Sequence, residues 1–380
     1  IDVTGSLPWT QADLQMDREI KLTINGVKAR LDGVAMDSGS SVLMFKIRPW
    51  WYPTAATPSF NAPAGGQQTM AFVSDSARLW LALLAGNVVK VYANTGSGFD
   101  YLVDVTLGNT GSAIAASAYN GDLYLVVAYK DQTSFPVVSW CRVPASGNGA
   151  TLGIHEPVLW NWAAGDSVLA VHAVTDANGP CLAASVRSST GGNTHLTFKH
   201  DGTGFTLGNT IAGGMDAVTA FNDAGKATLF HHHSAVSLNF NGFSTTSSTP
   251  NLSESFSTVN GLAAARWSGD LWAAVGESTK SRLFRNTAGD WSELAATGQP
   301  SGFSSSAGAT LRLYPTQDRL YLGYSGGSSG YTVAGWRGSW EVPPHLTGKP
   351  VQDVQLAWFN GKLYAALIAE YKLFVRECYP

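Results

Sequence analysis

The pattern that organises this chain is clearest in Asp122-Leu123-Tyr124-Leu125-Val126, where a charged residue precedes Leu, an aromatic residue and aliphatic residues. Four other segments repeat it: Arg78-Leu79-Trp80-Leu81-Ala82, Asp270-Leu271-Trp272-Ala273-Ala274, Arg319-Leu320-Tyr321-Leu322-Gly323 and Lys362-Leu363-Tyr364-Ala365-Ala366. Two weaker copies fill the long gap between Tyr124 and Trp272, namely Cys181-Leu182-Ala183-Ala184 and Ala227-Thr228-Leu229-Phe230. The chain therefore holds seven copies, spaced by about 45 residues, which is the period of a repeat fold.

Two kinds of turn recur in each unit. An aromatic residue and a turn precede most copies of the pattern, as in Tyr119-Asn120-Gly121, and Asn-Gly between apolar runs indicates a tight hairpin because Gly accepts a positive φ. A second turn follows further on and is succeeded by an aromatic residue, as in Asn94-Thr95-Gly96-Ser97-Gly98-Phe99. In the second unit, Pro144-Ala145-Ser146-Gly147-Asn148-Gly149 takes that place. Each unit is thus expected to hold four antiparallel strands, here named a to d in chain order. Seven such units predict an all-β, seven-bladed β-propeller.

The two ends of the chain are predicted to meet. The seventh unit has room for only three strands, and an open sheet edge there would leave backbone groups unpaired. Surplus strand-like segments precede the first full unit: Ile20–Asn25, Val27–Leu31 and Ser41–Ile47. We expect Ser41–Ile47 to close the ring as the outer strand of the last blade, so that the propeller covers residues 33–380. Residues 1–32, with a turn at Asn25-Gly26, are expected to form an extra β-hairpin arm; an eighth, partial blade is the alternative.

Composition excludes several classes of protein. Charged residues are 13% of the 380 residues, and the net charge is −3; a typical domain has roughly 25% charged residues. No basic excess is present to hold a phosphate backbone, so no nucleic acid is expected as a partner. No apolar run is long enough for membrane insertion. The three cysteines, Cys141, Cys181 and Cys378, exclude a disulfide-rich scaffold but allow one pair. The Ser- and Thr-rich, charge-poor surface favours a secreted or virion-surface location.

The two turns resemble those of known propellers. The hairpin Asn94-Thr95-Gly96-Ser97-Gly98-Phe99 resembles the repeats of integrin-like and fungal lectin propellers, and Trp336-Arg337-Gly338-Ser339-Trp340 resembles the blades of fucose-binding lectin propellers. The resemblance implies sugar sites in clefts between adjacent blades. The Asp-x-Asp-x-Asp-Gly calcium loop of integrin-like repeats is absent, as is the Asp box of sialidases, so no metal or other cofactor is expected.

Candidate ligand-binding residues follow from the expected topology, in which the b–c and d–a loops share the face that usually carries ligands. A sugar needs a flat apolar surface for its CH face and fixed polar groups for its hydroxyls. One d–a loop and three b–c loops, with the residues that flank them, supply such a mixture. The predicted ligand-binding residues are Tyr129, Asp131, Trp160, Trp162, Asp166, Glu277, Arg282 and Tyr324. The competing interpretation is that these aromatic residues pack between blades, as most propeller aromatics do.

Metal and catalytic signals are weaker. His231 and His233 share one face of a strand and His232 takes the other, so only two of the three could bind one metal ion, too few for a structural zinc site. No Gly-x-Ser-x-Gly, His-Glu-x-x-His or Walker motif occurs, and we expect no catalytic residues.

Three functions remain open. The first is a carbohydrate-binding, lectin- or adhesin-like propeller that recognises glycans. The second is a structural or receptor-binding component of a virion, phage tail or injection machine, in which residues 1–32 would mediate oligomerisation by adding a strand to a neighbouring sheet. The third is an extracellular glycan hydrolase or lyase that assembles its acidic groups from different blades at the channel mouth. A propeller supports all three.

Overall fold

The computed structural model describes most of the chain beyond residue 50. The described residues are 19–24, 30–31, 34–35, 41–46, 51–54, 57–62, 68–147, 152–153, 158–213, 217–243, 250–305, 310–325, 330–342, 346–347 and 349–378. The chain divides into two compact units, Ile1–Tyr52 and Pro53–Pro380. No helix of the described part is long and apolar enough to cross a membrane.

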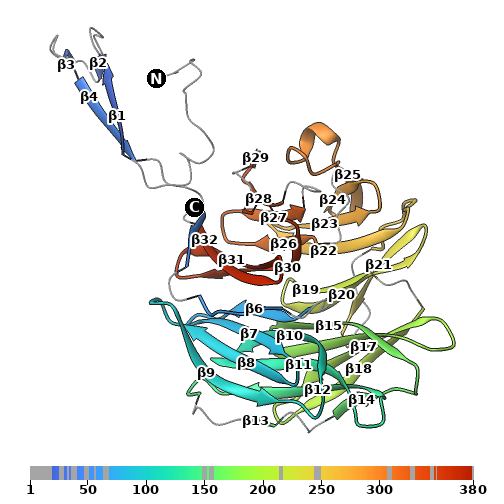
Figure 1. Ribbon diagram of the computed structural model, residues 1–380. Helices are drawn as coiled ribbons and strands as arrows, with labels where there is room; N and C mark the ends of the chain where they lie inside the picture. The colour runs from blue at the N-terminus through green and yellow to red at the C-terminus, as the bar shows by residue number, and fades with distance from the viewer. Residues whose placement is uncertain are drawn as a thin grey trace. The chain divides into compact units, whose positions relative to one another are not determined.

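Seven consecutive sheets form the propeller, and the colours of Figure 1 run through them in chain order, from blue to red. Blade 1 holds β6 (Met70–Ser74), β7 (Leu79–Ala85), β8 (Val88–Asn94) and β9 (Phe99–Thr106), and blade 2 holds β10 (Gly111–Tyr119), β11 (Asp122–Lys130), β12 (Pro136–Val143) and β14 (Val158–Asn161). Blade 3 holds β15 (Ser167–Asp176), β16 (Gly179–Arg187), β17 (Asn193–His200) and β18 (Phe205–Ala212). Blade 4 holds β19 (Val218–Asp223), β20 (Lys226–Ser234) and β21 (Ser237–Gly242), with Leu252 bridged to Leu238 where a fourth strand would lie.

The last three blades have four strands each. Blade 5 holds β22 (Val259–Trp267), β23 (Asp270–Glu277), β24 (Ser281–Thr287) and β25 (Asp290–Glu293), followed by a short 3₁₀ turn, Ala296–Gly298. Blade 6 holds β26 (Arg312–Pro315), β27 (Leu320–Ser325), β28 (Tyr331–Trp336) and β29 (Trp340–Glu341). Blade 7 holds β30 (Val351–Phe359), β31 (Lys362–Ala369), β32 (Lys372–Cys378) and β5 (Trp51–Pro53). The prediction of a seven-bladed propeller closed by an N-terminal strand is confirmed.

The repeated Leu-aromatic pair explains why the blades stack. Successive side chains of a strand point to opposite faces, and strand b lies inside its blade, so both of its faces are covered by neighbouring blades. The aromatic residue of one blade packs in the same core as the Leu of the next. The pairs are Trp80 with Leu123, Tyr124 with Leu182, Phe230 with Leu271, Trp272 with Leu320, and Tyr364 with Leu79. The last pair joins blade 7 to blade 1, so the ring is closed by the same packing that builds it.

The aromatic residue after the second turn also packs between blades. At the start of strand d it faces the preceding blade: Phe99 joins the core between blades 7 and 1, and Phe205 packs against the core between blades 2 and 3. Trp291 stacks on Phe240 of blade 4 at 5.5 Å between ring centroids. Trp340 meets Trp272 of blade 5 edge to face at 6.4 Å. This recurrent turn therefore has an architectural role in at least four blades.

A belt of polar contacts follows the a–b end of the ring. The contacts join each blade to the next: Arg78 to the Ala145 carbonyl, Thr175 to the Ala118 carbonyl, Asn222 to the Thr175 carbonyl, Arg266 to Asp223, the Trp267 indole to the Thr316 carbonyl, the Trp358 amide to the Tyr314 hydroxyl, and Ser74 to the Trp358 carbonyl. Because these contacts span all seven junctions, the blades are held by directional bonds as well as by apolar packing.

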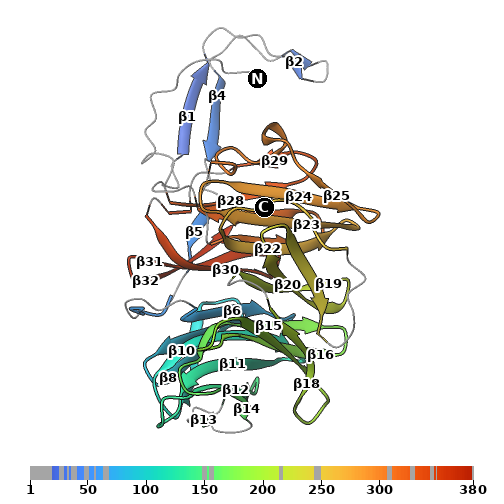
Figure 2. The ribbon, with the colours of Figure 1, turned by 90° about the vertical axis from the view of Figure 1, so that its right-hand side faces the viewer.

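Ser41–Ile47 was the wrong choice for the closing strand. The strand β4 (Ser41–Lys46) pairs instead with β1 (Glu19–Ile24), and β2 (Arg30–Leu31) pairs with β3 (Val34–Ala35). The fourth position of blade 7 belongs to β5, next to β32 (Figures 1 and 2). The pattern misled because two short apolar strands precede blade 1 and either could fill a free edge. The expected turn at Asn25-Gly26 lies outside the described residues, and the first unit extends beyond residue 32, to Tyr52.

Blade 2 also departs from the expected hairpin between its third and fourth strands. After β12 the chain forms β13 (Leu152–Gly153), which runs parallel to β9 on the outer edge of blade 1, and only then returns as β14 of blade 2. The excursion protects an outer edge of the first blade. It is an exception to the tight turn expected at Pro144–Gly149, since β12 and β14 are joined through a neighbouring sheet.

One glycine allows blades 3 and 4 to approach. A Cβ added to Gly208 would lie 2.0 Å from the carbonyl oxygen of Phe243, whereas one added to Gly204 would meet nothing within 4 Å. We expect Gly208→Ala to lower the free energy of unfolding by about 1–3 kcal/mol through overpacking, and Gly204→Ala to change it by no more than about 0.5 kcal/mol. Urea unfolding of both variants tests this. Equal effects would contradict the close approach of Gly208 to Phe243.

Candidate functional site

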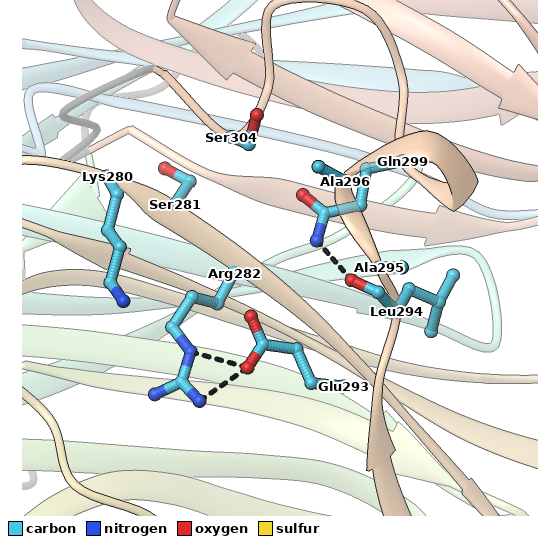
Figure 3. A pocket seen from close by; sticks show the side chains of 9 residues that line it. All are labelled: Lys280, Ser281, Arg282, Glu293, Leu294, Ala295, Ala296, Gln299 and Ser304. Carbon is cyan, nitrogen blue, oxygen red and sulfur yellow. Dashed lines mark hydrogen bonds and ion pairs between the residues drawn. The ribbon is translucent and has the colours of Figure 1, made fainter.

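A pocket of about 340 Å³ lies in blade 5 on the side of the b–c and d–a loops. Three parts of the blade form it: the end of the b–c loop with the start of β24, the end of β25, and the connection toward blade 6. Its lining residues are Lys280, Ser281, Arg282, Glu293, Leu294, Ala295, Ala296, Gln299 and Ser304 (Figure 3). The pocket is of a size that accommodates a small organic ligand.

Arg282 holds the wall of this pocket together. Its side chain is 8% exposed, and its Nε and Nη2 atoms both donate to one oxygen of Glu293, at 3.0 and 2.6 Å. The same guanidinium contacts Glu254 at 3.4 Å and the carboxylate of Glu277 at 3.6 Å. Burial by itself would lower the pKa of Arg282, but the bonds to Glu293 and the nearby carboxylates outweigh it and raise that pKa. The arginine is therefore permanently charged and fixes three acidic side chains around it.

The second oxygen of Glu293 and the amide oxygen of Gln299 are directed into the pocket (Figure 3). Gln299 is 9% exposed; its amide nitrogen donates to the Leu294 carbonyl, and its amide oxygen is buried without a hydrogen-bond partner among the described residues. Lys280 is exposed at the rim. Leu294, Ala295 and Ala296 contribute apolar surface. The pocket thus places the partly exposed carboxylate of Glu293, the buried and unpaired amide oxygen of Gln299 and an ammonium group beside an apolar wall, a set that suits a ligand rich in hydroxyl groups.

Two predicted site residues are brought together here, and others of the pocket were missed. Glu277 and Arg282 form the ion pair given above, and Glu277 also accepts hydrogen bonds from the amide and hydroxyl of Ser257. Glu277 is 2% exposed and acts behind the pocket wall. Glu293, Gln299 and Ser304 were not predicted. Gln299 and Ser304 lie in a d–a connection that was expected on the ligand-bearing face. The local sequence gives no sign, however, that the Gln299 amide oxygen would lack a hydrogen-bond donor.

The two predicted tyrosines are part of the core. Tyr129 is 6% exposed and packs between blades 1 and 2. Tyr324 is 2% exposed, and its hydroxyl donates to the Ser301 carbonyl at 2.7 Å. Burial raises the pKa of Tyr324 to about 12, so the phenol is neutral and a committed donor. Both side chains take the packing role that was the competing interpretation.

The two predicted aspartates stabilise loops. Asp131 accepts from the amide and hydroxyl of Thr133 and from the Phe135 amide, and these bonds, the Thr133 hydroxyl first, lower its pKa. Asp166 accepts from the amides of Ala163 and Ser189, which ties the d–a loop of blade 2 to the b–c loop of blade 3. One oxygen of Asp131 and both oxygens of Asp166 accept from groups of the loops themselves, so both residues stabilise loop conformation.

The two predicted tryptophans differ in what the structure describes. Trp162 is partly buried and packs against the core between blades 2 and 3. Trp160 lies in β14, paired with Val138, and its side chain is outside the described part. Neither lines the pocket in blade 5. An aromatic surface for a sugar, expected from the sequence, is therefore not a feature of that pocket.

The histidine run and the channel show no metal or catalytic cluster in the described part of the chain. His231 and His232 are buried and His233 is exposed, and no three potential ligands among the described residues are placed to hold a metal ion. Along the described inner strands, Asp353 is the one carboxylate near the d–a end; it pairs with Arg312 at 3.4 Å, and burial raises its pKa to about 6. A hydrolytic site of two facing carboxylates is not formed by these residues.

Comparison with known proteins establishes the fold and leaves the family open. No protein-family model matches the chain, and no curated protein sequence matches it. Among solved structures, the BP39L lectin from Burkholderia pseudomallei is 13% identical and superimposes with a TM-score of 0.57, over 82% of this chain and 96% of the lectin. The expected resemblance to lectin-type propellers is thus confirmed for the fold.

Other propellers are similar to the same degree. BBS1N, solved in complex with ARL6DN, is 14% identical, with a TM-score of 0.52 over 88% of this chain and 98% of that one. The β-propeller domain of the Trilobed protease from Pyrococcus furiosus, described as having an open velcro topology, is 6% identical, with a TM-score of 0.51 over 82% and 95%. These likenesses agree with the β-propeller fold, whose seven blades are seen in the sheets of this chain, and they do not carry an activity.

Arg282 provides a direct test of the site's construction. Removing it leaves Glu277 buried without its countercharge, so Arg282→Met should lower the free energy of unfolding by about 3–5 kcal/mol. Arg285→Met is the matched control, because Arg285 lies on the same strand, is 43% exposed and pairs with Asp270 at the surface; it should cost no more than about 1 kcal/mol. Urea unfolding measures both. A small effect of Arg282→Met would show that the carboxylates do not depend on it.

Proposed function

We propose that this protein is a carbohydrate-binding propeller that recognises glycans through the pocket in blade 5. The observation that carries the proposal is the pair of acceptor oxygens, one from Glu293 and one from Gln299, held at the edge of an apolar wall by Arg282 and by the Leu294 carbonyl. Sugar hydroxyls donate to such oxygens, and the apolar wall takes the CH face of the ring. The match in fold to a lectin supports this choice among the functions that propellers serve.

The charge-poor composition is consistent with the proposal. With 13% charged residues, the surface offers few strong fields, and recognition of neutral, hydroxylated ligands relies on short-range hydrogen bonds. We extend the proposal to location: a secreted or virion-surface protein that contacts glycosylated surfaces. In the second candidate function, a component of a larger assembly, the first unit would supply the contact, and the pairing of β1 with β4 gives that unit strands of its own.

Binding to a glycan array, followed by titration with the best methyl glycoside, tests the proposal. Gln299→Leu removes the buried, unpaired amide oxygen together with the amide nitrogen that donates to the Leu294 carbonyl, so we expect affinity about tenfold weaker, corresponding to about 1.4 kcal/mol for one hydrogen bond to the ligand. Ser305→Ala is the matched control: Ser305 is exposed, lies next to the pocket residue Ser304 and bonds only within its own turn in the described contacts.

The possible results distinguish a failure of the proposed glycan binding from a failure of the proposed pocket. Binding that Gln299→Leu weakens and Ser305→Ala preserves supports both. Binding that neither variant changes would keep the function and remove this pocket from it. Absence of binding to any glycan would contradict the function, and self-association that requires the first unit would then favour the assembly role.

A further inference from the structure

Three histidine side chains from blades 3 and 4 gather where these two blades meet. They are His172 on β15, His195 on β17 and His231 on β20, and we call them the histidine cluster. The rings of His195 and His231 are 5.0 Å apart between centroids, and both side chains are fully buried. His172 is half-buried on the inner strand of blade 3 and is close enough to His195 for their charges to interact. The sequence singled out His231 but could not show that His195 would meet it from another blade.

Each ring of the cluster has a nitrogen without a hydrogen-bond partner among the described residues. His195 shares a hydrogen bond with the Ser185 hydroxyl through Nδ1 at 2.7 Å, and His231 donates from Nε2 to the Asn241 side-chain oxygen at 2.9 Å. The unpartnered atoms are Nε2 of His172, Nε2 of His195 and Nδ1 of His231. A neutral imidazole needs only one donor contact, whereas an imidazolium has two N–H groups to satisfy. Protonation would therefore add a buried donor that has no acceptor.

The surroundings of the cluster do not compensate a positive charge. Besides burial, the charges of His195 and Arg312 lower the pKa of His172, and the charge of His231 lowers that of His195. Burial and the charges of His232 and His233 lower the pKa of His231, whereas its hydrogen bond to Asn241 raises it. Among the described residues, no carboxylate raises the pKa of a histidine in the cluster. Burial lowers the pKa of the neighbouring His232, whose ring lies against Phe256, and the charge of Glu277 opposes that shift. A proton taken up here would meet other histidines and an arginine.

We infer that the histidine cluster is an acid-sensitive lock that holds blades 3 and 4 together when its rings are neutral and releases them when they take up protons. Blade 4 has three strands in the described part, and its junction with blade 3 includes close backbone contacts such as the bond from the Ala177 amide to the Gly225 carbonyl at 2.9 Å. This lock would act on the propeller as a whole and does not depend on the proposed glycan pocket in blade 5.

The direction of the effect follows from the difference in proton affinity between the closed and open junction. Burial lowers the pKa of His195 to about 4 and that of His172 to about 3, whereas a hydrated histidine titrates near 6.5. The open junction therefore binds protons more readily, so the lock is at full strength above pH 6.5 and weakens as pH falls below it. For His195 alone, opening should become about 30-fold more frequent at pH 5 than at pH 7.5.

Hydrogen exchange of the full chain tests the lock. The Ala177 amide reports on the junction of blades 3 and 4, and the Ile114 amide, which donates to the Gln68 carbonyl at 2.9 Å, reports on the junction of blades 1 and 2. After correction for intrinsic rates, we expect the protection of Ala177 to fall by at least about 30-fold from pH 7.5 to pH 5, with Ile114 changing much less. His195→Gln should remove a factor of about 30 from the pH dependence at Ala177.

His200→Gln is the matched control. His200 lies on β17 like His195, but its ring faces Tyr124 of blade 2, at 5.3 Å between centroids, so its replacement should leave the pH dependence intact. If His195→Gln does not fold, His172→Gln is read out in the same way. Equal loss of protection at Ala177 and Ile114 would show global acid unfolding and overturn the lock, as would a pH dependence that survives both cluster variants.

Discussion

Strand b must be buried on both faces, and the rest of the ring depends on that constraint. Trp80 and Leu79 are adjacent in sequence, yet they belong to cores on opposite sides of blade 1. A blade separated from its neighbours would expose both, at a cost of about 1.5–3 kcal/mol for each large apolar side chain. Stability is therefore shared around the ring, and a blade missing its outer strand would leave two interfaces incomplete. The role of β5 in the last blade follows from this.

The polar contacts add specificity to that packing. Apolar packing is not directional and would allow one blade to shift along its neighbour. The polar contacts at the a–b ends are directional and fix the position of each blade relative to the next. In three blades the charged residue that opens the repeated pattern forms an ion pair within its own blade: Asp122 pairs with Arg142, Asp270 with Arg285, and Arg319 with Glu341. These pairs are partly exposed and each contributes little to stability. Because such pairs recur, they contribute more to the alignment of strands within a blade than to the free energy of unfolding.

Much of the fold could be predicted from the sequence because its signals are local. Asn120-Gly121 marks a turn by itself, and the Leu-aromatic pair marks strand b, so blade number and order followed. The closing strand could not be distinguished, since β4 and β5 are both short apolar strands whose difference lies in their partners. The site was harder still. Tyr324 and Trp162 were predicted as ligand contacts; the structure buries Tyr324 between blades 5 and 6 and packs Trp162 in part against the core between blades 2 and 3. The position of the Gln299 oxygen depends on the short turn before it, which the sequence pattern does not predict.

The pocket in blade 5 lies where one blade departs from the repeated pattern. Blade 5 follows the same plan as the others, and Arg282 at the start of its third strand gathers Glu254, Glu277 and Glu293 from three different segments. In a chain with few charges, this concentration stands out from the balanced pairs elsewhere. Asp353, which is buried on the inner strand of blade 7, pairs with the partly exposed Arg312 of blade 6. Function in a propeller arises at such departures from the repeat, because the repeat itself is occupied with packing.

The ring is closed by β5 next to β32, and the amide of Thr54 is a direct probe of that closure. This amide, which directly follows β5, donates to the Val375 carbonyl of β32 at 3.1 Å, and the Ala62 amide donates to the Tyr371 carbonyl at 2.7 Å. In native-state hydrogen exchange, both should be protected to the same degree as the Leu84 amide, which bonds to the Thr69 carbonyl within blade 1. Exchange of Thr54 and Ala62 at the rate of an open chain, with blade 1 still protected, would contradict a ring closed by the start of the chain.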